Sequence, residues 1–98
     1  MSLRHVVCFR FHPGTTSEQV DALAASLREL PGLIPEIDVY RVGPDLGINP
    51  TSWDFTVNAD FTDEAAYLVY RDHPEHQKRI EEKVVPLTAE RVAVQFTI

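Results

Sequence analysis

The segment best suited to chemistry is YRDHPEH, residues 70–76, in which two of the four histidines flank a proline and a tyrosine lies upstream. Removal of a proton next to a carbonyl needs a base whose pKa lies near the working pH, and an unperturbed histidine meets that condition. A tyrosine hydroxyl can donate a hydrogen bond to the oxygen on which negative charge then develops. The segment therefore suggests acid/base chemistry that needs no cofactor.

The position of Pro74 makes His76 the candidate base. Proline suits the first position of a helix and pushes the preceding residue out of the helical region, so a new helix should begin at Pro74. His76 then occupies the third position, within the turn whose unpaired N–H groups carry partial positive charge. That field disfavours the imidazolium and should keep His76 neutral, while Tyr70 could act as the donor.

Structural roles compete with these assignments. His73 is expected to cap the new helix or to face solvent, and packing competes for Tyr70, which shares a helical face with Tyr67. For His76 a structural role and a role as the base stay open. The spacing of the two histidines also resembles that of metal ligands. Because no Cys or carboxylate stands nearby in H-E-x-x-H register, no metal site is predicted.

The rest of the chain must supply the elements that hold this segment. Residues 3–11 alternate in polarity and predict a first strand with His5, Val7, Phe9 and Phe11 on one face. His5 would be a polar group in an apolar wall. It is either a buried histidine satisfied by one hydrogen bond or a group that orients a ligand.

The remaining elements follow from periodicity and from helix-capping signals. Thr16 and Gln19 form a capping box before a helix that Pro31-Gly32 should stop. Thr62 should cap a short helix that reaches about Arg71. Strands are predicted over residues 37–42, 53–61 and 91–98, a loop over 43–52, and a second helical piece from 74 to about 85.

The order β-α-β-β-α-β predicts an α+β, ferredoxin-like fold with a four-stranded antiparallel sheet and a second helix broken at His73-Pro74. The strongly apolar faces of the first, third and last strands should pack on the helices. The other face would then carry Val6, Cys8, Thr56, Asn58, Ala93 and Gln95. A symmetric second copy could cover that face, and the two sheets would form a barrel.

Composition limits the classes of partner and compartment. The 98 residues make one domain, 1–98, and a net charge of −6 without a Lys/Arg cluster argues against nucleic acid. The single Cys8 cannot form a disulfide within the chain. No run of about 18 apolar residues is present, so no membrane segment is predicted. We expect a cytoplasmic protein.

Four stretches carry a resemblance to a known family: HVVCFRF, LPGLIPEI, AYLVYRDHPEHQ and VQFTI. In them the chain resembles the stress-responsive dimeric α/β-barrel (Dabb) domain over essentially its whole length. The resemblance implies a homodimer whose two sheets form a barrel. By similarity to the cyclase-like members, it also implies a working pair of Tyr70 and His76 with His5 in the same pocket. Phe9, Phe55 and Val57 would line the apolar part of the cavity.

These observations lead to one expected function and two alternatives. The first is a homodimer that binds a small, largely apolar, carbonyl-bearing ligand, with cofactor-free catalysis of the cyclase, lyase or isomerase type at His76, Tyr70 and His5. Trp53, which follows the 43–52 loop, would lie at the pocket mouth. The alternatives are a small-ligand-binding or stress-protective dimer without chemistry, and a cofactor-free monooxygenase.

Overall fold

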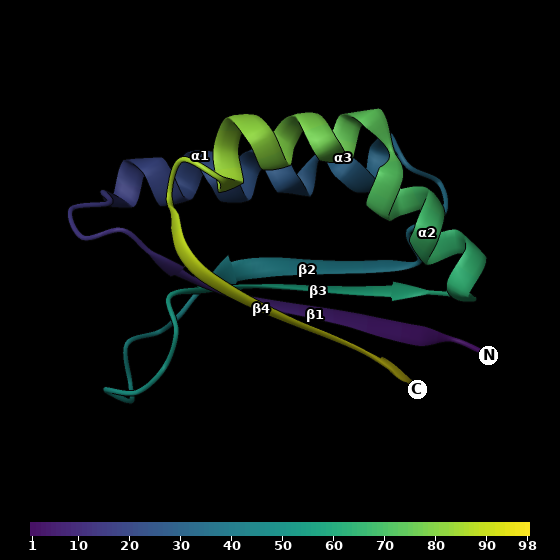
Figure 1. Cartoon of the computed structure of the whole chain (residues 1–98), viewed down its shortest axis with the longest axis horizontal. Coiled ribbons are helices and arrows are strands. Elements are labelled where there is room, and N and C mark those ends of the chain that lie inside the picture. Colours follow the sequence, from purple (N-terminus) through teal and green to yellow (C-terminus); the bar gives the residue numbers. More distant parts are fainter.

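The computed structural model describes residues 1–98 and contains a four-stranded antiparallel sheet with helices on one face (Figure 1). The strands lie in the order β2-β3-β1-β4. This architecture confirms the predicted ferredoxin-like α+β fold with a broken second helix. The elements are β1 (Leu3–Phe11), α1 (Ser17–Arg28), β2 (Val39–Pro44), β3 (Phe55–Phe61), α2 (Glu64–Asp72), α3 (Pro74–Arg79) and β4 (Thr88–Thr97).

The first helix begins at the predicted capping box. The Thr16 hydroxyl accepts a hydrogen bond from the Gln19 backbone N–H at 3.2 Å. In return, the Gln19 side chain accepts from the Thr16 N–H at 2.8 Å. Two of the N–H groups that a helix start leaves unpaired are thus satisfied. The helix ends at Arg28, ahead of a 3₁₀ turn over Leu30–Gly32.

Pro74 divides the second helical region, as predicted. His73 has an extended backbone, with φ −63° and ψ 134°, and its Nδ1 accepts a hydrogen bond from the Glu75 N–H at 3.1 Å. His73 is therefore the N-cap of α3. Beyond α3 the chain widens into a π-helical turn over Ile80–Val84. The break lets α2 and α3 run in different directions above the sheet (Figure 1).

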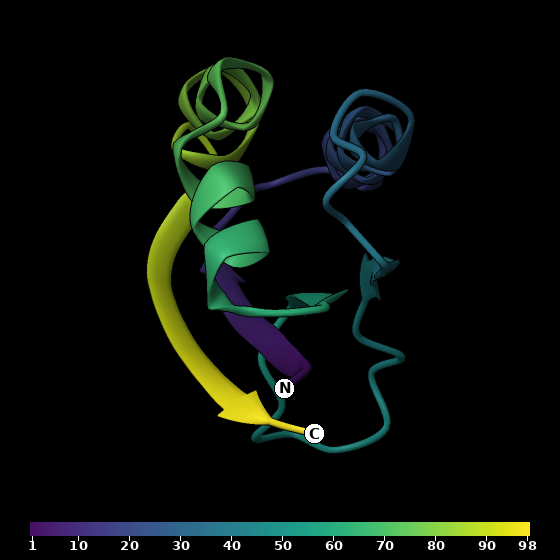
Figure 2. The ribbon, with the colours of Figure 1, turned by 90° about the vertical axis from the view of Figure 1, so that its right-hand side faces the viewer.

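The core fills the space between the helices and the inner face of the sheet. Figure 2 shows α1 and the α2–α3 pair on the same side of the sheet, whose opposite face carries no helix. Fourteen buried apolar residues form this core. The largest fully buried side chains are Tyr70, Phe55, Phe61, Leu23, Leu30 and Ile34.

The predicted faces of β4 are reversed in the structure. Its register with β1 pairs Gln95 with His5 and Arg91 with Phe9, and paired residues share a face of the sheet. Arg91, Ala93 and Gln95 therefore face the helices. The apolar alternate residues lie on the outer face, between 46% and 57% exposed: Val92, Val94, Phe96 and Ile98. Periodicity separates the two faces of a strand but does not say which one the helices cover.

Several element boundaries also differ from the prediction. Asp63, rather than Thr62, is the N-cap of α2, because its carboxylate accepts from the Ala66 N–H at 2.8 Å. Strand β3 begins at Phe55 rather than Trp53. Near that point the Asp54 carboxylate accepts from the Phe11 N–H at 2.8 Å, so a side chain takes the place of a ladder acceptor. Strand β2 lies two residues later than predicted, and β4 begins at Thr88.

Candidate functional site

A cavity of about 500 Å³ lies between the inner face of the sheet and the α2–α3 region. Its walls are mostly apolar, with polar groups from β1, β2, β4, α2 and α3. That combination is typical of small-molecule sites. The lining residues are His5, Val7, Phe9, Leu27, Tyr40, Val57, Tyr67, Tyr70, Arg71, His76, Gln77, Ile80, Val84, Val85, Thr88, Arg91, Ala93 and Gln95.

One row of residues across the inner face of the sheet supplies many of the polar groups of the cavity. The strand registers align Tyr40, Ala59, His5 and Gln95 on the inner face of β2, β3, β1 and β4. Neighbouring strands lie about 4.8 Å apart, so the row spans the width of the sheet. Ala59 is fully buried and bears only a methyl group. The ring of Tyr70 packs above this row, with its centroid 6.2 Å from that of His5.

His76 is buried in the cavity wall, and its hydrogen bond defines its tautomer. The ring stacks on Tyr70 with centroids 4.0 Å apart and an interplanar angle of 29°. Its Nδ1 lies 3.1 Å from the backbone carbonyl oxygen of Arg71. A carbonyl oxygen only accepts, so Nδ1 carries the proton in this contact. In the neutral ring, Nε2 is then the acceptor, as a general base requires.

Burial is the main reason that the pKa of His76 lies below its usual value. The backbone carbonyls of Arg71 and Tyr70 act in the opposite direction, while the positive charge of Arg91 adds to the lowering. A neutral His76 agrees with the direction expected from the sequence. The main cause differs, because the pKa is lowered chiefly by removal of the ring from water.

His5 is the second neutral imidazole of the cavity. Burial, with the charge of Arg91 and the nearby His76 as smaller causes, lowers its pKa to about 4. The Gln95 side-chain nitrogen lies 2.8 Å from Nδ1 of His5 and donates to it. The His5 proton is then on Nε2. The two imidazoles are therefore complementary, since His5 offers a donor at Nε2 and His76 an acceptor.

Two tyrosine hydroxyls complete the polar set. The Tyr40 and Tyr70 oxygens lie 3.2 Å apart. Burial raises the pKa of Tyr40 to about 12 and raises the pKa of Tyr70 further, so both hydroxyls keep their protons at neutral pH. Their mutual hydrogen bond uses one of the two protons. The other is available to donate to a ligand oxygen.

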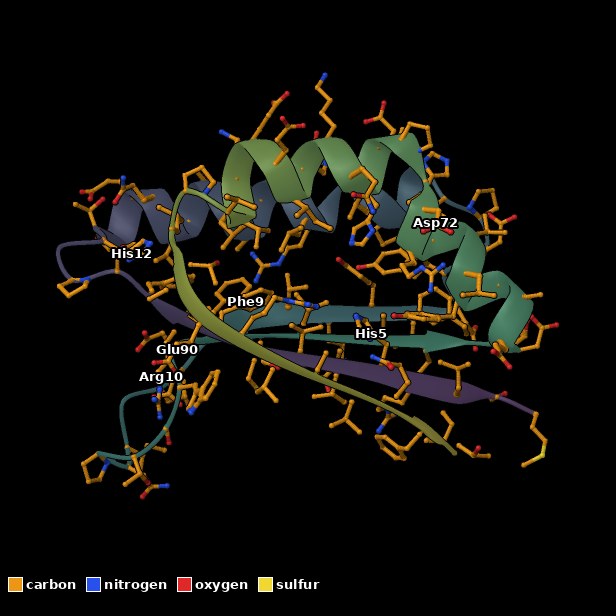
Figure 3. The ribbon with its side chains drawn as sticks, viewed as in Figure 1. His5, Phe9, Arg10, His12, Asp72 and Glu90 are labelled. Carbon is orange, nitrogen blue, oxygen red and sulfur yellow. The ribbon has the colours of Figure 1, made fainter.

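The structure brings together five of the seven predicted site residues. His5, Phe9, Val57, Tyr70 and His76 all line the cavity. Figure 3 shows His5 and Phe9 on the helix side of the sheet. Arg10 and Glu90 lie near the loop of residues 45–54, which connects β2 to β3.

Phe55 and Trp53 do not line this cavity. Phe55 is 2% exposed and packs between the rings of Phe9 and Phe11. The Arg10 guanidinium lies 4.3 Å from the centroid of the Trp53 ring. Phe55 and Trp53 both border a separate hollow beside the 45–54 loop. Cys8 and Val92, on the outer face of the sheet, also line that hollow.

Seven of the polar residues that line the cavity were absent from the predicted site, among them Tyr40, Arg91 and Gln95. The alternation of β4 puts Arg91 and Gln95 on the same face of the strand. The pairing of Gln95 with His5 would have shown that this face is the one that the helices cover. Tyr40 meets Tyr70 across 30 positions of sequence, and no local pattern signals that contact.

No group of three or more His, Cys, Asp or Glu side chains is arranged to hold a metal ion. His73 and His76 each use Nδ1 in a contact with the backbone, at Glu75 and Arg71. Separately, none of the helices combines the length and the apolar character needed to cross a membrane.

Solved structures share this fold across nearly the whole chain. A dimeric ferredoxin-like protein of unknown function from Thermobifida fusca is 39% identical, with a TM-score of 0.92, over 100% of this chain and 92% of the other. A dimeric protein of unknown function from Bacteroides fragilis is 20% identical, with a TM-score of 0.85, over 99% and 96%. The hydroxynitrile lyase of Passiflora edulis is 22% identical, with a TM-score of 0.86, over 99% and 93%.

No curated protein matches the chain in sequence. The family model described as the stress responsive A/B barrel domain matches residues 3–98. That match covers every strand and helix, including the elements that build the cavity. The chain therefore belongs to the stress-responsive A/B barrel domain (Dabb) family.

Proposed function

We propose that this chain is a homodimer in which each subunit binds a small, largely apolar, carbonyl-bearing ligand and removes a proton beside the carbonyl. The observation that carries this proposal is the state of His76 in the cavity. Its Nδ1 proton is held by the Arg71 carbonyl, and the lowered pKa keeps Nε2 unprotonated at neutral pH. A base in that state needs no activation by a cofactor.

The proposed proton transfer uses the polar groups of the cavity wall. Nε2 of His76 takes a proton from the carbon next to the ligand carbonyl, and the electron pair of that C–H bond moves toward the carbonyl oxygen. The free proton of the Tyr40–Tyr70 pair hydrogen-bonds the developing enolate, with Nε2–H of His5 as a second donor. His76, now protonated, returns the proton to the product.

Exchange of hydrogen for deuterium in a simple ketone tests this step. 4-Phenyl-2-butanone combines an apolar body with a carbonyl and has exchangeable protons beside it. In D2O at neutral pH, we expect the protein to accelerate their loss, measured by proton NMR. His76→Gln should reduce the acceleration by about 10²- to 10⁴-fold, the usual contribution of a general base.

His73→Ala is the matched control, because His73 lies three residues away and caps α3 through its ring. This variant should lose stability but keep its exchange activity. Equal activity of His76→Gln and the wild type would rule out His76 as the base. Ketone that binds in the cavity but shows no exchange above background would favour the alternative of a binding protein without chemistry.

The outer face of the sheet supports the homodimer. Val92, Val94 and Phe96 of β4 form an apolar row beside Val6 and Cys8 of β1. Contiguous exposed apolar surface of this kind marks an interaction site in a folded protein. The Thermobifida fusca and Bacteroides fragilis proteins are described as dimeric. A twin subunit that packs against this face would bury the row and leave the cavity, on the other face, free for ligand.

A further inference from the structure

We propose that the ligand of this cavity is a carboxylate, with an apolar body between the sheet and the helices and its acid group on the guanidinium of Arg91. The inference rests on the proposed function, since it presumes that the cavity holds a ligand. It adds the charge and the chemical class of that ligand, and it assigns a role to a residue outside the proton-transfer set.

The register of β4, an edge strand of the sheet, places Arg91 in the cavity wall at an exposed position. Arg91 pairs with Phe9 of β1 on the inner sheet face and lies two positions before Ala93 and four before Gln95, which line the same cavity. Its neighbour Glu90 points to the opposite face and bonds Arg10 at 3.2 Å. The alternation of the strand thus separates Arg91 from the nearest acidic residue in the sequence.

The guanidinium of Arg91 makes no ion pair and no hydrogen bond within the chain. The second cationic side chain of the cavity, Arg71, is held by both carboxylate oxygens of Asp72 at 2.9 and 3.1 Å. The other ion-paired arginines contact Asp60, Glu90, Glu29 and Glu75. Arg91 is therefore the cation of the cavity whose donors remain free for a ligand.

The cavity wall contains no acidic residue, although the chain has 15 Asp and Glu residues and a net charge of −6. Its two histidines are neutral, so the unpaired positive charge in it belongs to Arg91. The fork of a guanidinium matches a carboxylate in shape and can donate two parallel hydrogen bonds. A carboxylic acid with an apolar body matches both the apolar lining of the cavity and the guanidinium of Arg91.

A matched pair of probes separates charge from shape. 3-Phenylpropanoate and 3-phenylpropanamide share the apolar body and the carbonyl and differ in charge. Dissociation constants are measured by NMR titration at low ionic strength. Because Arg91 is exposed and solvent screens its charge, we expect the wild type to bind the carboxylate about tenfold more tightly than the amide.

Arg91→Gln should bring the affinity for the carboxylate down to that for the amide and leave the amide unchanged. Arg91→Lys should keep part of the preference, since the charge remains but the fork is lost. Lys78→Gln is the control for net charge, because Lys78 is exposed on α3 and forms no ion pair. This variant should behave like the wild type.

Three outcomes would contradict the proposal, and they differ in what else they affect. Equal affinities of the wild type for both probes would overturn the carboxylate but leave the cavity as a ligand site. A preference that survives in Arg91→Gln would overturn the assignment to Arg91. Failure of both probes to bind would count against the cavity as a ligand site, and so against the proposed function as well.

Discussion

At the scale of single residues, the cavity wall contains two imidazoles whose Nδ1 atoms have opposite hydrogen-bonding roles. His76 donates through Nδ1 to a backbone carbonyl, whereas His5 accepts at Nδ1 from the Gln95 amide. The location of His76 at the third position of a helix could be predicted, because Pro74 determines where that helix begins. The partners of both rings could not, since they depend on strand register and on the turn between α2 and α3.

Burial of His5 makes stability depend on pH. Its pKa is about 4 in the folded protein and about 6.5 when unfolded, so between these values the unfolded state binds more protons. The contribution of neutral His5 to the free energy of unfolding is complete above about pH 6.5 and is lost as the pH falls toward 4. The loss should be at most about 3 kcal/mol, because water in the cavity screens part of the penalty.

Urea unfolding at several pH values measures this loss. In His5→Gln, which has no titrating group at the position, the free energy of unfolding should fall less steeply between pH 6.5 and 4. His76 also has a lowered pKa and contributes a slope of the same sign. A His5→Gln variant with the same pH dependence as the wild type would contradict the assignment to His5.

At the scale of elements, Arg79 links α3 to the rest of the helical layer. Its guanidinium donates to the Ser26 carbonyl of α1 at 3.0 Å and to the Glu75 carboxylate one turn earlier at 2.6 Å. The side chain is 14% exposed. Since α3 is only six residues long and starts at a proline, these contacts hold the segment that carries His76.

Arg79→Met should therefore lower the free energy of unfolding by about 2 kcal/mol, the usual contribution of hydrogen bonds from a charged group. The adjacent Lys78 is exposed on α3, so Lys78→Met should change the free energy by less than about 0.5 kcal/mol. Chemical denaturation followed by circular dichroism measures both. Equal effects of the two substitutions would show that the link to α1 adds no stability.

At the scale of the whole molecule, the proposed dimer explains why the faces of β4 could not be assigned from sequence. The fold itself followed from alternation, capping and the order of elements. In a chain that is covered on both faces of its sheet, however, an apolar row can face either the helices or a twin subunit. For β4 the rule that apolar residues face the helices gave the wrong answer, and Arg91 and Gln95 were missed with it.

Val94→Glu tests the proposed interface. Val94 is 57% exposed on the outer sheet face, and a carboxylate there would have to be buried without a partner in the dimer. We expect the variant to sediment as a folded monomer at micromolar concentration, where the wild type sediments as a dimer. Val69→Glu, at a 44% exposed site on α2, should remain dimeric. A dimeric Val94→Glu protein would exclude this face as the interface.

The difference between the hydrogen-bond partners of the two imidazoles also bears on how such a protein can diverge. The ring at position 76 is oriented by a main-chain oxygen, which no substitution removes, so its tautomer is robust to mutation. The ring at position 5 is oriented by a side chain on a neighbouring strand, which a single codon change can replace. If the proposed function holds, substitutions at position 95 would alter ligand recognition through His5, while the tautomer of the proposed base at position 76 would stay the same.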